Sequence, residues 1–343
     1  MAKECSVIIL NWNGEAMLRR YLPSVVEYTQ GDGIEIVVAD NGSTDGSVAF
    51  LQTQPVRVVK LEENFGFAEG YNRAIAQVDA EYVVLLNSDV EVTEGWLDTL
   101  LTYARTHVEV GALQPKILSW LSKEEAKTKH SDQILFEHAG AAGGMMDCLG
   151  YPYCRGRFLS YVEIDNGQYD DVAPVFWASG ACLFIRRDVY LQVGGLDADF
   201  FAHQEEIDLC WRLHSRGFKV MVVPQSKVYH LGGGALGYES PRKTFLNFRN
   251  NLLMLYKNLP TGKLYFVLFV RFFLDYIAAL QMLVSGKSLN TKAVLQARWE
   301  FFKLRRRFKT KRKCVIRNAK VPNPTIISKR SIIVDYYLLG KRK

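Results

Sequence analysis

The sequence predicts an α/β fold in which a mixed, mostly parallel sheet carries helices on both faces, followed by a helical C-terminal extension. Strand-like and helix-like segments alternate through the first hundred residues, which is typical of such a sheet. The strand-like segments are continuously apolar, as expected where both faces of the sheet are covered. The extension differs in charge, because residues 1–240 hold 19 Lys and Arg against 33 Asp and Glu, whereas residues 241–343 hold 24 against 3.

The predicted elements follow one another in a regular order. Strands are expected over 6–10, 34–39, 56–61 and 82–86, and helices over 15–28, 46–52, 68–78 and 96–107. Residues 119–172 lose the alternation and are predicted to form loops and short strands beside the functional face. A strand over 175–185, a helix over 205–217 and a strand over 219–223 complete the body, which closes near His230 before the flexible run Gly232–Gly234.

The cysteines and the first residues bear on the cellular compartment. The six cysteines are scattered and form no CxxC pair, which predicts free thiols in a reducing compartment and argues against a zinc site. No signal-peptide pattern precedes the first strand. These features predict a cytoplasmic protein.

The extension combines an apolar helix with a basic run. Residues 264–284 are long enough to span a bilayer, but Arg271 and Asp275 interrupt them, four positions apart and able to pair on one helix face. A helix in the membrane interface or packed on the body is favoured over a spanning one, and a buried core helix stays open. The cationic run 303–313 predicts a polyanionic partner, and its apolar neighbour favours an anionic membrane surface over nucleic acid.

Polar residues follow each of the four predicted strands. Ligands of parallel sheets bind beyond the carboxyl ends of the strands, so these residues are the candidates for a binding site. Asp40 follows the second strand and can accept hydrogen bonds from a nucleobase or a ribose, although the segment 40–46 also fits an ordinary capped turn. The glycines of 63–75 allow close backbone approach to a ligand, but the dinucleotide fingerprint GxGxxG is absent.

The fourth strand ends in Asn87-Ser88-Asp89. A hard cation such as Mg²⁺ or Mn²⁺ binds through one or two carboxylates and completes its shell with water and phosphate oxygens. Asp89 therefore has the chemistry of such a ligand, although a strand-end Asp is often only a cap.

Taken in order, these motifs resemble the family 2 glycosyltransferases of the GT-A fold. The resemblance rests on SVIILNWNG, VVADNGSTDGS, ENFGFAEGYNRAI, VVLLNSDVEV and the segment from WASGACLF to HSRGFKV. It covers about residues 5–235 and is greatest for the bacterial rhamnosyltransferase-like branch. It implies a Rossmann-like catalytic domain over 1–240, with a nucleotide-binding half over about 1–115 and an acceptor half over about 116–240. Residues 241–343 then form a separate helical, membrane-associating extension.

The resemblance also implies roles for individual residues. Asn87-Ser88-Asp89 matches the Asp-x-Asp metal motif with Asn in its first position, so Asp89 is the expected ligand of Mg²⁺ or Mn²⁺ and His230 the late histidine that completes the site. The donor nucleotide is expected to contact Asn11, Asp40, Asn41, Asn64, Gly66, Asn72, Asn87 and Ser88. The donor sugar and acceptor cleft is expected to be lined by Trp177, Gly180, Ala181 and Asp208.

The expected catalytic base belongs to an acidic pair. Glu205-Glu206 matches the family's Glu-Asp pair, whose second member is the usual base, and here a glutamate replaces that aspartate. Glu206 is the first candidate, with Glu205 and Asp208 as alternatives. One base is enough for an inverting transfer, in which the acceptor hydroxyl displaces a nucleoside diphosphate directly.

These implications give one expected function and two alternatives. The expected protein is an inverting glycosyltransferase on the inner face of the plasma membrane. It moves a sugar, rhamnose in this branch, from a dTDP- or UDP-sugar to a glycan or polyprenyl-diphosphate-linked acceptor in cell-surface glycan synthesis. A nucleic-acid-binding protein with a basic tail and a non-catalytic sugar-nucleotide binder are the alternatives. Phe308 is the one aromatic residue within 303–313, so no nucleic acid partner is expected.

Overall fold

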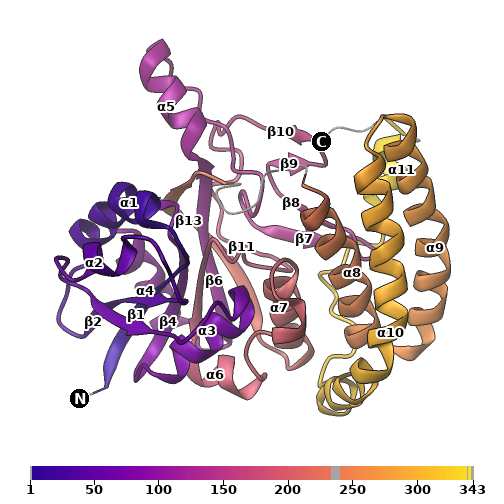
Figure 1. Ribbon diagram of the computed structural model, residues 1–343, viewed down its shortest axis with the longest axis horizontal. Coiled ribbons are helices and arrows are strands. Elements are labelled where there is room, and N and C mark those ends of the chain that lie inside the picture. The colour runs from indigo at the N-terminus through magenta and orange to yellow at the C-terminus, as the bar shows by residue number, and fades with distance from the viewer. Residues whose placement is uncertain (1, 233–239, 338, 341–343) are drawn as a thin grey trace.

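The computed structural model describes residues 2–232, 240–337 and 339–340 and confirms the predicted fold class (Figure 1). A mixed sheet with helices on both sides forms the body, and a group of long helices lies beside it. Within the described residues nine strands form the main sheet, in the order β11-β13-β6-β12-β4-β1-β2-β3, and β5 pairs with β13. The strands are β1 (Lys3–Asn11), β2 (Ile34–Asp40), β3 (Arg57–Lys60), β4 (Ala80–Asn87), β5 (Val90–Val92), β6 (Val110–Ser119), β11 (Ala173–Pro174), β12 (Cys182–Arg186) and β13 (Lys219–His230).

Helices of the body lie on both faces of this sheet, and α5 projects beyond the end of the strands (Figure 1). The helices are α1 (Glu15–Tyr28), α2 (Ser47–Leu51), α3 (Gly66–Ala76), α4 (Trp96–Thr106), α5 (Trp120–Lys129), α6 (Arg187–Gln192), η1 (Ala198–Phe200) and α7 (Glu205–Ser215). Alternate residues of one strand enter different clusters: Val7 and Ile9 pack with α1 and α4, whereas Ile8 packs with α3, α6 and α7. Both faces of the strand are therefore buried, which is why its sequence is continuously apolar.

The central segment is more ordered than the sequence predicts. The expected loops at 119–172 contain the helix α5, and a small second sheet of β7 (Gly144–Met146), β8 (Pro152–Cys154), β9 (Arg157–Phe158) and β10 (Tyr161–Val162). The side chain of Ser119 caps α5 by accepting a hydrogen bond from the Ser122 N–H, 3.2 Å away. The charged residues of α5 surround most of the helix, so no apolar stripe marks it in the sequence.

The last strand of the body is longer than predicted. β13 continues past Val223 as far as His230, and its carboxyl-terminal part pairs with both β5 and β6. Gly233 and Gly234 of the predicted flexible run lie outside the described residues.

The extension forms a helical layer against the body. Its helices are α8 (Pro241–Asn258), α9 (Thr261–Val284), α10 (Ser288–Asn318) and α11 (Ile332–Tyr337). α8 faces the body and α9 lies at the outer edge (Figure 1). α9 is the one helix of the described chain that is long and apolar enough to cross a membrane by length and composition.

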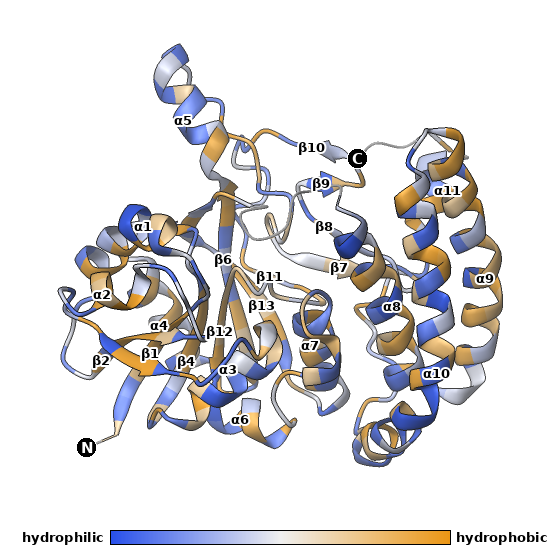
Figure 2. Cartoon of the chain, in the orientation of Figure 1, coloured by the Kyte–Doolittle hydropathy of each residue, from blue (hydrophilic) through white to orange (hydrophobic). Residues whose placement is uncertain are grey.

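The two charges that interrupt α9 face inward. Arg271 donates to Asp275 over 3.1 Å, as predicted, and Arg298 of α10 donates to the other oxygen of Asp275 over 2.6 Å. Both residues of the α9 pair are buried, whereas Phe266 and Phe269 are each about two-thirds exposed, at 67% and 64%. The outer side of α9 is therefore almost wholly apolar, as the orange stretches along it show (Figure 2).

Part of the basic charge of the extension is neutralised by the body. Lys257 of α8 binds Asp197 over 2.6 Å and Asp208 over 2.8 Å. Lys311 and Arg307 of α10 bind Asp199 over 2.7 and 2.8 Å. These cations therefore have partners within the same chain, which the charge composition did not predict, and the predicted polyanionic partner would have to be bound by the other basic residues of the extension.

Candidate active site

The parallel strands bring the predicted polar residues to one edge of the sheet. β1 lies between β2 and β4, with Asn11 opposite Asp40 and Leu10 opposite Asn87. The three strands run in the same direction, so their carboxyl ends and the polar residues there are neighbours. Ser88 lies close as well, because a Cβ atom on Gly14 would meet the Asn11 amide oxygen at 2.5 Å and the Ser88 hydroxyl at 3.8 Å.

Asp40 is buried at this edge and braces two loops. Its carboxylate accepts hydrogen bonds from the Asn11 amide over 3.2 Å and from the Ser43 N–H over 3.1 Å. A carboxylate has about four acceptor positions, so it keeps capacity for a ligand. The Asn11 Oδ1 atom is buried and has no hydrogen-bond partner within the described part of the chain. An orphaned acceptor beside a carboxylate fits a ligand that donates N–H or O–H groups.

Asn41 and Asn64 hold the loop after β2 against the loop after β3. The Asn41 amide donates to Asn64 over 3.1 Å and to the Gly66 carbonyl over 3.2 Å, and Asn64 accepts from the Gly66 N–H over 2.9 Å. Gly66 has φ +77°, and a Cβ atom there would lie 2.5 Å from the ring of Phe201. A residue without a side chain is required at this position, so the loop is shaped by packing as well as by hydrogen bonds.

Asp89, His230 and Glu137 form a chain of three buried side chains. β5 runs antiparallel to β13 with Val90 opposite His230, which places Asp89 beside the imidazole. His230 Nε2 lies 3.1 Å from Asp89, and Nδ1 lies 3.5 Å from Glu137. Glu137 is held by its own backbone, whose N–H donates to Ile117 over 3.1 Å at the end of β6.

The two carboxylates set the charge of the histidine. Burial alone lowers the pKa of His230, but Glu137 and Asp89 outweigh burial and raise that pKa to about 10. Burial opposes ionisation of both acids, and the imidazolium nevertheless lowers the pKa of Asp89 and of Glu137. Without a bound cation, His230 is therefore an imidazolium between two carboxylates.

The donor atoms fit a divalent cation. Two ligands at right angles and about 2.1 Å from one ion lie about 3 Å apart, and Asp89 and His230 Nε2 are separated by 3.1 Å. Glu137 would then hold the other imidazole nitrogen, as a carboxylate commonly does for a metal-bound histidine. No group of three or more acidic, His or Cys ligands gathers anywhere in the described residues, so water and ligand oxygens would complete the shell.

The acidic pair begins α7, and its two members differ. Glu205 is buried, and burial together with the charge of Glu206 raises its pKa well above the usual range. Glu206 is half-buried, and burial raises its pKa to about 7 against the backbone N–H groups that lower it. A Cβ atom on Gly180 would lie 3.9 Å from the Glu206 Cβ, and the neighbouring Ala181 carbonyl accepts from the Asn87 N–H over 3.0 Å. The segment 180–181 thus joins the acidic pair to the end of β4.

A strained turn precedes this helix. Phe201, His203 and Gln204 have φ values of 65°, 69° and 73°, in the left-handed region that residues with side chains rarely adopt. Each such residue costs about 1–3 kcal/mol and persists only where its surroundings hold it. The Phe201 carbonyl accepts from the Phe67 N–H over 2.9 Å, which ties the turn to the start of α3.

Three predicted site residues lie elsewhere. Trp177 is a core residue, because its indole covers Gly144 and donates to the Met145 carbonyl over 2.9 Å. Asn72 donates to the Leu196 carbonyl over 2.8 Å and accepts from the Tyr190 hydroxyl over 2.6 Å, so its amide is used in packing α3.

Asp208 is the third, and it is neither a cleft residue nor an available base. Its carboxylate is fully buried and accepts from Arg212, Lys257 and Asn258 over 2.9, 2.8 and 2.8 Å. Two cationic side chains and an amide already occupy this buried carboxylate, and no acceptor hydroxyl can reach it.

Sequence reasoning missed Glu137 and the residues that hold the turn. Glu137 lies in a segment without periodicity, and no local pattern separates it from the many surface acids around it. Asn250 of α8 is fully buried and contacts the turn before α7. Consecutive polar residues inside an otherwise apolar helix, as in the run 249–251, are the one signal that points to them.

Comparison with known proteins gives a consistent picture. A family model described as glycosyl transferase family 2 matches residues 6–145. The N-acetylglucosaminyl-diphospho-decaprenol L-rhamnosyltransferase of Mycobacterium tuberculosis is 31% identical over 237 residues, which cover 65% of this chain and 75% of that protein.

Solved structures share the fold at low sequence identity. GalNAc-T7 with UDP, GalNAc and Mn²⁺ aligns with a TM-score of 0.59 and 17% identity, over 85% of this chain and 54% of that one. S. aureus TarS 1-349 aligns with a TM-score of 0.54 and 14% identity, over 98% of this chain and 92% of that one. The chain therefore spans about half the length of the first structure and most of the second.

Replacing Glu137 by Gln should weaken divalent cation binding while leaving the ligands in place. Loss of a carboxylate behind a metal-bound histidine typically costs about 10- to 100-fold in metal affinity. We expect the Mn²⁺ dissociation constant, measured by calorimetry in the presence of nucleoside diphosphate, to rise within that range. Asp89→Ala is the reference and should remove binding altogether. Unchanged Mn²⁺ affinity in Glu137→Gln would show that Glu137 does not support the site.

Glu206 should control the pH dependence of activity. With a pKa of about 7, its base form increases as the pH rises, so kcat/KM for transfer should climb through pH 7. Glu206→Gln should lower kcat by about 10²–10⁴-fold.

The stability of this variant separates lost chemistry from lost folding. A carboxyl group whose pKa is raised in the folded protein stabilises folding most at low pH. This stabilisation decreases as the pH rises from the pKa of the group in the unfolded chain to its folded pKa of about 7. The Gln variant should therefore melt no lower than the parent above pH 7. If Glu206→Gln keeps its activity, Glu206 is not the base. The same conclusion follows if the acidic side of its kcat/KM profile against pH matches that of the parent.

Proposed function

Because this chain belongs to glycosyl transferase family 2, we propose that it is an inverting, divalent-cation-dependent enzyme that glycosylates a lipid-linked acceptor. The observation that carries this proposal is the position of the Asp89–His230 pair at the carboxyl edge of the sheet, two residues after Asn87 and at the same edge as Asp40. The segment 180–181 connects this edge to Glu206, the candidate base. A cation site, a nucleotide-binding edge and one base are what direct displacement of a nucleoside diphosphate requires.

The chain's own residues account for the proton and for binding of the donor. Glu206 accepts the proton of the acceptor hydroxyl, and the hydroxyl oxygen bonds to the anomeric carbon while the bond from that carbon to the diphosphate breaks. The diphosphate leaves with the bonding electron pair, and the configuration inverts. A cation held by Asp89 and His230, as Mn²⁺ is present in the related GalNAc-T7 structure, would offset charge on the diphosphate.

The nucleotide-binding edge offers acceptors to a nucleoside. The Asn11 Oδ1 atom needs a donor and Asp40 can accept another, and a nucleoside supplies such donors from base N–H and ribose O–H groups. We propose dTDP-rhamnose as the donor, since the Mycobacterium tuberculosis relative is named an L-rhamnosyltransferase. UDP-sugars share the same base edge and are the competing donors.

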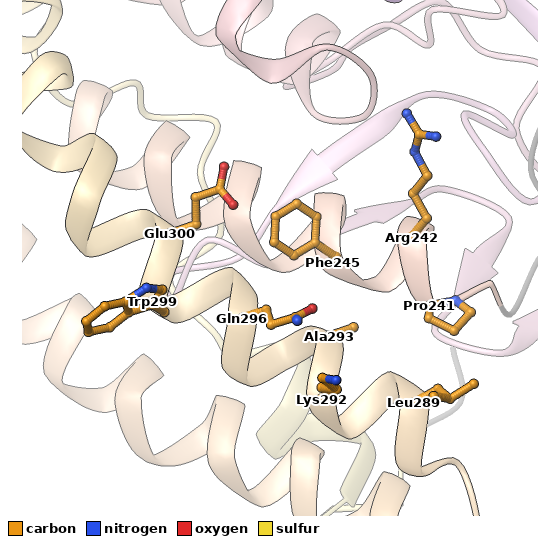
Figure 3. A pocket seen from close by; sticks show the side chains of 9 residues that line it. All are labelled: Pro241, Arg242, Phe245, Leu289, Lys292, Ala293, Gln296, Trp299 and Glu300. Atoms are coloured by element: carbon orange, nitrogen blue, oxygen red, sulfur yellow. The ribbon is translucent and has the colours of Figure 1, made fainter.

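The extension offers a place for an amphiphilic acceptor. A cavity of about 620 Å³ lies between the start of α8 and the middle of α10 (Figure 3). Its lining joins the cationic Arg242 and Lys292 to the apolar Phe245 and Trp299. It also contains Glu300, whose carboxylate is paired with Arg249 over 3.2 Å, so the unpaired charge favours a diphosphate that carries a hydrocarbon chain. The Arg242 guanidinium also lies 5.4 Å from the ring of Phe201, in the turn before α7. We propose that this cavity receives the diphosphate end of a polyprenyl-linked acceptor.

The outer face of α9 is proposed to lie in the membrane. Its exposed aromatic residues occupy one side of the helix, and the Arg271–Asp275 pair occupies the other. An amphipathic helix of this kind lies in the interface of the bilayer, and basic residues nearby add attraction to anionic lipids. The protein would thus be peripheral on the cytoplasmic face of the plasma membrane, where lipid-linked acceptors and nucleotide sugars are both accessible.

Transfer should be specific for one donor and should depend on Asp89. Purified protein with Mn²⁺, dTDP-rhamnose and N-acetylglucosaminyl-diphosphoprenol should give a product one deoxyhexose heavier by mass spectrometry, with inverted anomeric configuration by NMR. Asp89→Ala should reduce the rate to background, because the donor diphosphate loses its cation. UDP-sugars in parallel reactions identify a different donor. A fully folded protein that binds nucleotides and transfers no sugar from any donor would instead be a non-catalytic binder.

Charges on the outer face of α9 should release the protein from membranes. Phe266, Phe269 and Phe273 recur on one helix face, and replacing all three by Glu removes aromatic burial and adds repulsion from anionic lipid. We expect binding to phosphatidylglycerol vesicles to fall by at least about tenfold in a sedimentation assay, since 1.4 kcal/mol is already a factor of ten.

The control is Leu191→Glu, which replaces an apolar residue on α6 of the body that is about as exposed as Phe273. It should leave vesicle binding unchanged, and both variants should keep their activity on a water-soluble acceptor analogue. Equal losses in the two variants, or none in the α9 variant, would place the membrane contact elsewhere.

A further inference from the structure

Side chains of α8 in the extension hold most of the carbonyls in the turn that positions the acidic pair. Asn250 Nδ2 lies within hydrogen-bond distance of three backbone carbonyls in this turn, at 2.9 Å from Phe200, 2.9 Å from Ala202 and 2.8 Å from His203. Arg249 adds contacts at 3.2 Å to the carbonyls of Asp199 and Phe200. Four carbonyl oxygens between residues 199 and 203 therefore face two adjacent side chains of α8, Arg249 and Asn250.

Each of these side chains is itself fixed. The Asn250 oxygen accepts from Arg249 Nε over 2.9 Å, which determines which end of the amide faces the turn. Arg249 is anchored to Glu300 of α10 over 3.2 Å. Asn251, the next residue, donates to the Gln204 side chain over 3.3 Å and accepts from Arg271 of α9 over 2.6 Å. All three long helices of the extension thus take part in holding this turn.

The turn requires such support because its backbone is strained. Three of its residues have left-handed φ values, and Gln204, the last of them, directly precedes Glu205 at the start of α7. In a relaxed turn these carbonyls would accept hydrogen bonds from water or from other N–H groups. Donors fixed on α8 select the strained conformation, and that conformation determines where α7 begins and where Glu206 lies.

We propose that Asn250 is a positioning residue for the catalytic base, so that the extension forms part of the active site as well as serving the membrane. This inference rests on the proposed function, in which Glu206 takes the acceptor proton. Asn250 does not touch the substrate. It acts through the turn, by keeping Glu206 in its half-buried place beside Gly180.

Asn250→Leu tests the inference, because Leu has a similar size and donates no hydrogen bond. A base displaced by about 1 Å can cost about 10²-fold in rate, so we expect kcat to fall about 10- to 100-fold with the KM for the donor nearly unchanged. A relaxed turn also admits water to Glu206. Burial is the main cause that raises its pKa, and the adjacent charged groups are Glu205 and Asp208 of the same helix and the neutral His203 of the turn. The acidic limb of the kcat/KM profile should therefore move down by about one pH unit.

Asn258→Leu is the matched control. Asn258 is also a buried amide of α8, but it donates to Asp208 and to the Met254 carbonyl and does not reach the turn. It should lower the melting temperature to a similar extent and leave the acidic limb at the pH of the parent. A merely structural role of Asn250 predicts the same behaviour for both variants.

The outcomes are separable from those of the proposed function. If Asn250→Leu keeps the kcat and the acidic limb of the parent, or changes them only as Asn258→Leu does, the positioning role is overturned. If Asn250→Leu does not fold, Asn250→Ser decides in its place, since Ser keeps one donor with a shorter reach, and an unchanged kcat and limb there overturn it equally. If Glu206→Gln remains active, the assignment of the base fails, whatever Asn250 does.

Discussion

The architecture depends on one buried carboxylate, that of Asp208 in α7, and on what surrounds it. Taking an ionised carboxylate out of water costs several kcal/mol unless cations and hydrogen-bond donors replace the water. Arg212 supplies one cation from the same helix, whereas Lys257 and Asn258 reach it from α8. Separating the extension from the body would remove Lys257 and Asn258 and leave Arg212 to pair with the Asp208 carboxylate. The contact adds little net stability, but its Lys257 ion pair, which is shared with Asp197, fixes how α7 and α8 are placed relative to each other.

A second acid extends this contact along the interface. Asp197 is buried, and Lys257 and Lys311 lower its pKa against the effect of burial. The same lysine, Lys257, therefore serves Asp197 before the turn and Asp208 within α7. The opposite charges of the two parts of the sequence, acidic before residue 240 and basic after it, are partly the two sides of this interface. Charge composition alone suggested an external partner because it does not reveal intramolecular pairing.

Most of the fold could be predicted because its signals are local. Continuous apolar runs gave β1, β2 and β4 within a few residues, and parallel strands necessarily brought Asn11, Asp40 and Asn87 to one edge. Partners far apart in the sequence leave no such signal. Glu137 meets His230 across more than ninety positions, and Asn72 and Trp177 have suitable side chains that are used up in packing. Residue type identifies what a side chain can do, whereas three-dimensional neighbours decide whether it is available.

The interface also connects the proposed membrane contact to the proposed catalytic base within one chain. Arg271 turns away from the apolar face of α9 and donates to Asn251 of α8, which in turn reaches Gln204 at the start of α7. A short series of hydrogen bonds thus joins the helix proposed to lie on the membrane to the helix that carries the base. An acceptor anchored in a bilayer presents its hydroxyl at a fixed height above the lipid. Under the proposed function, a rigid connection of this kind would keep Glu206 at a matching height, which a flexible linker between an anchor and an enzyme would not do.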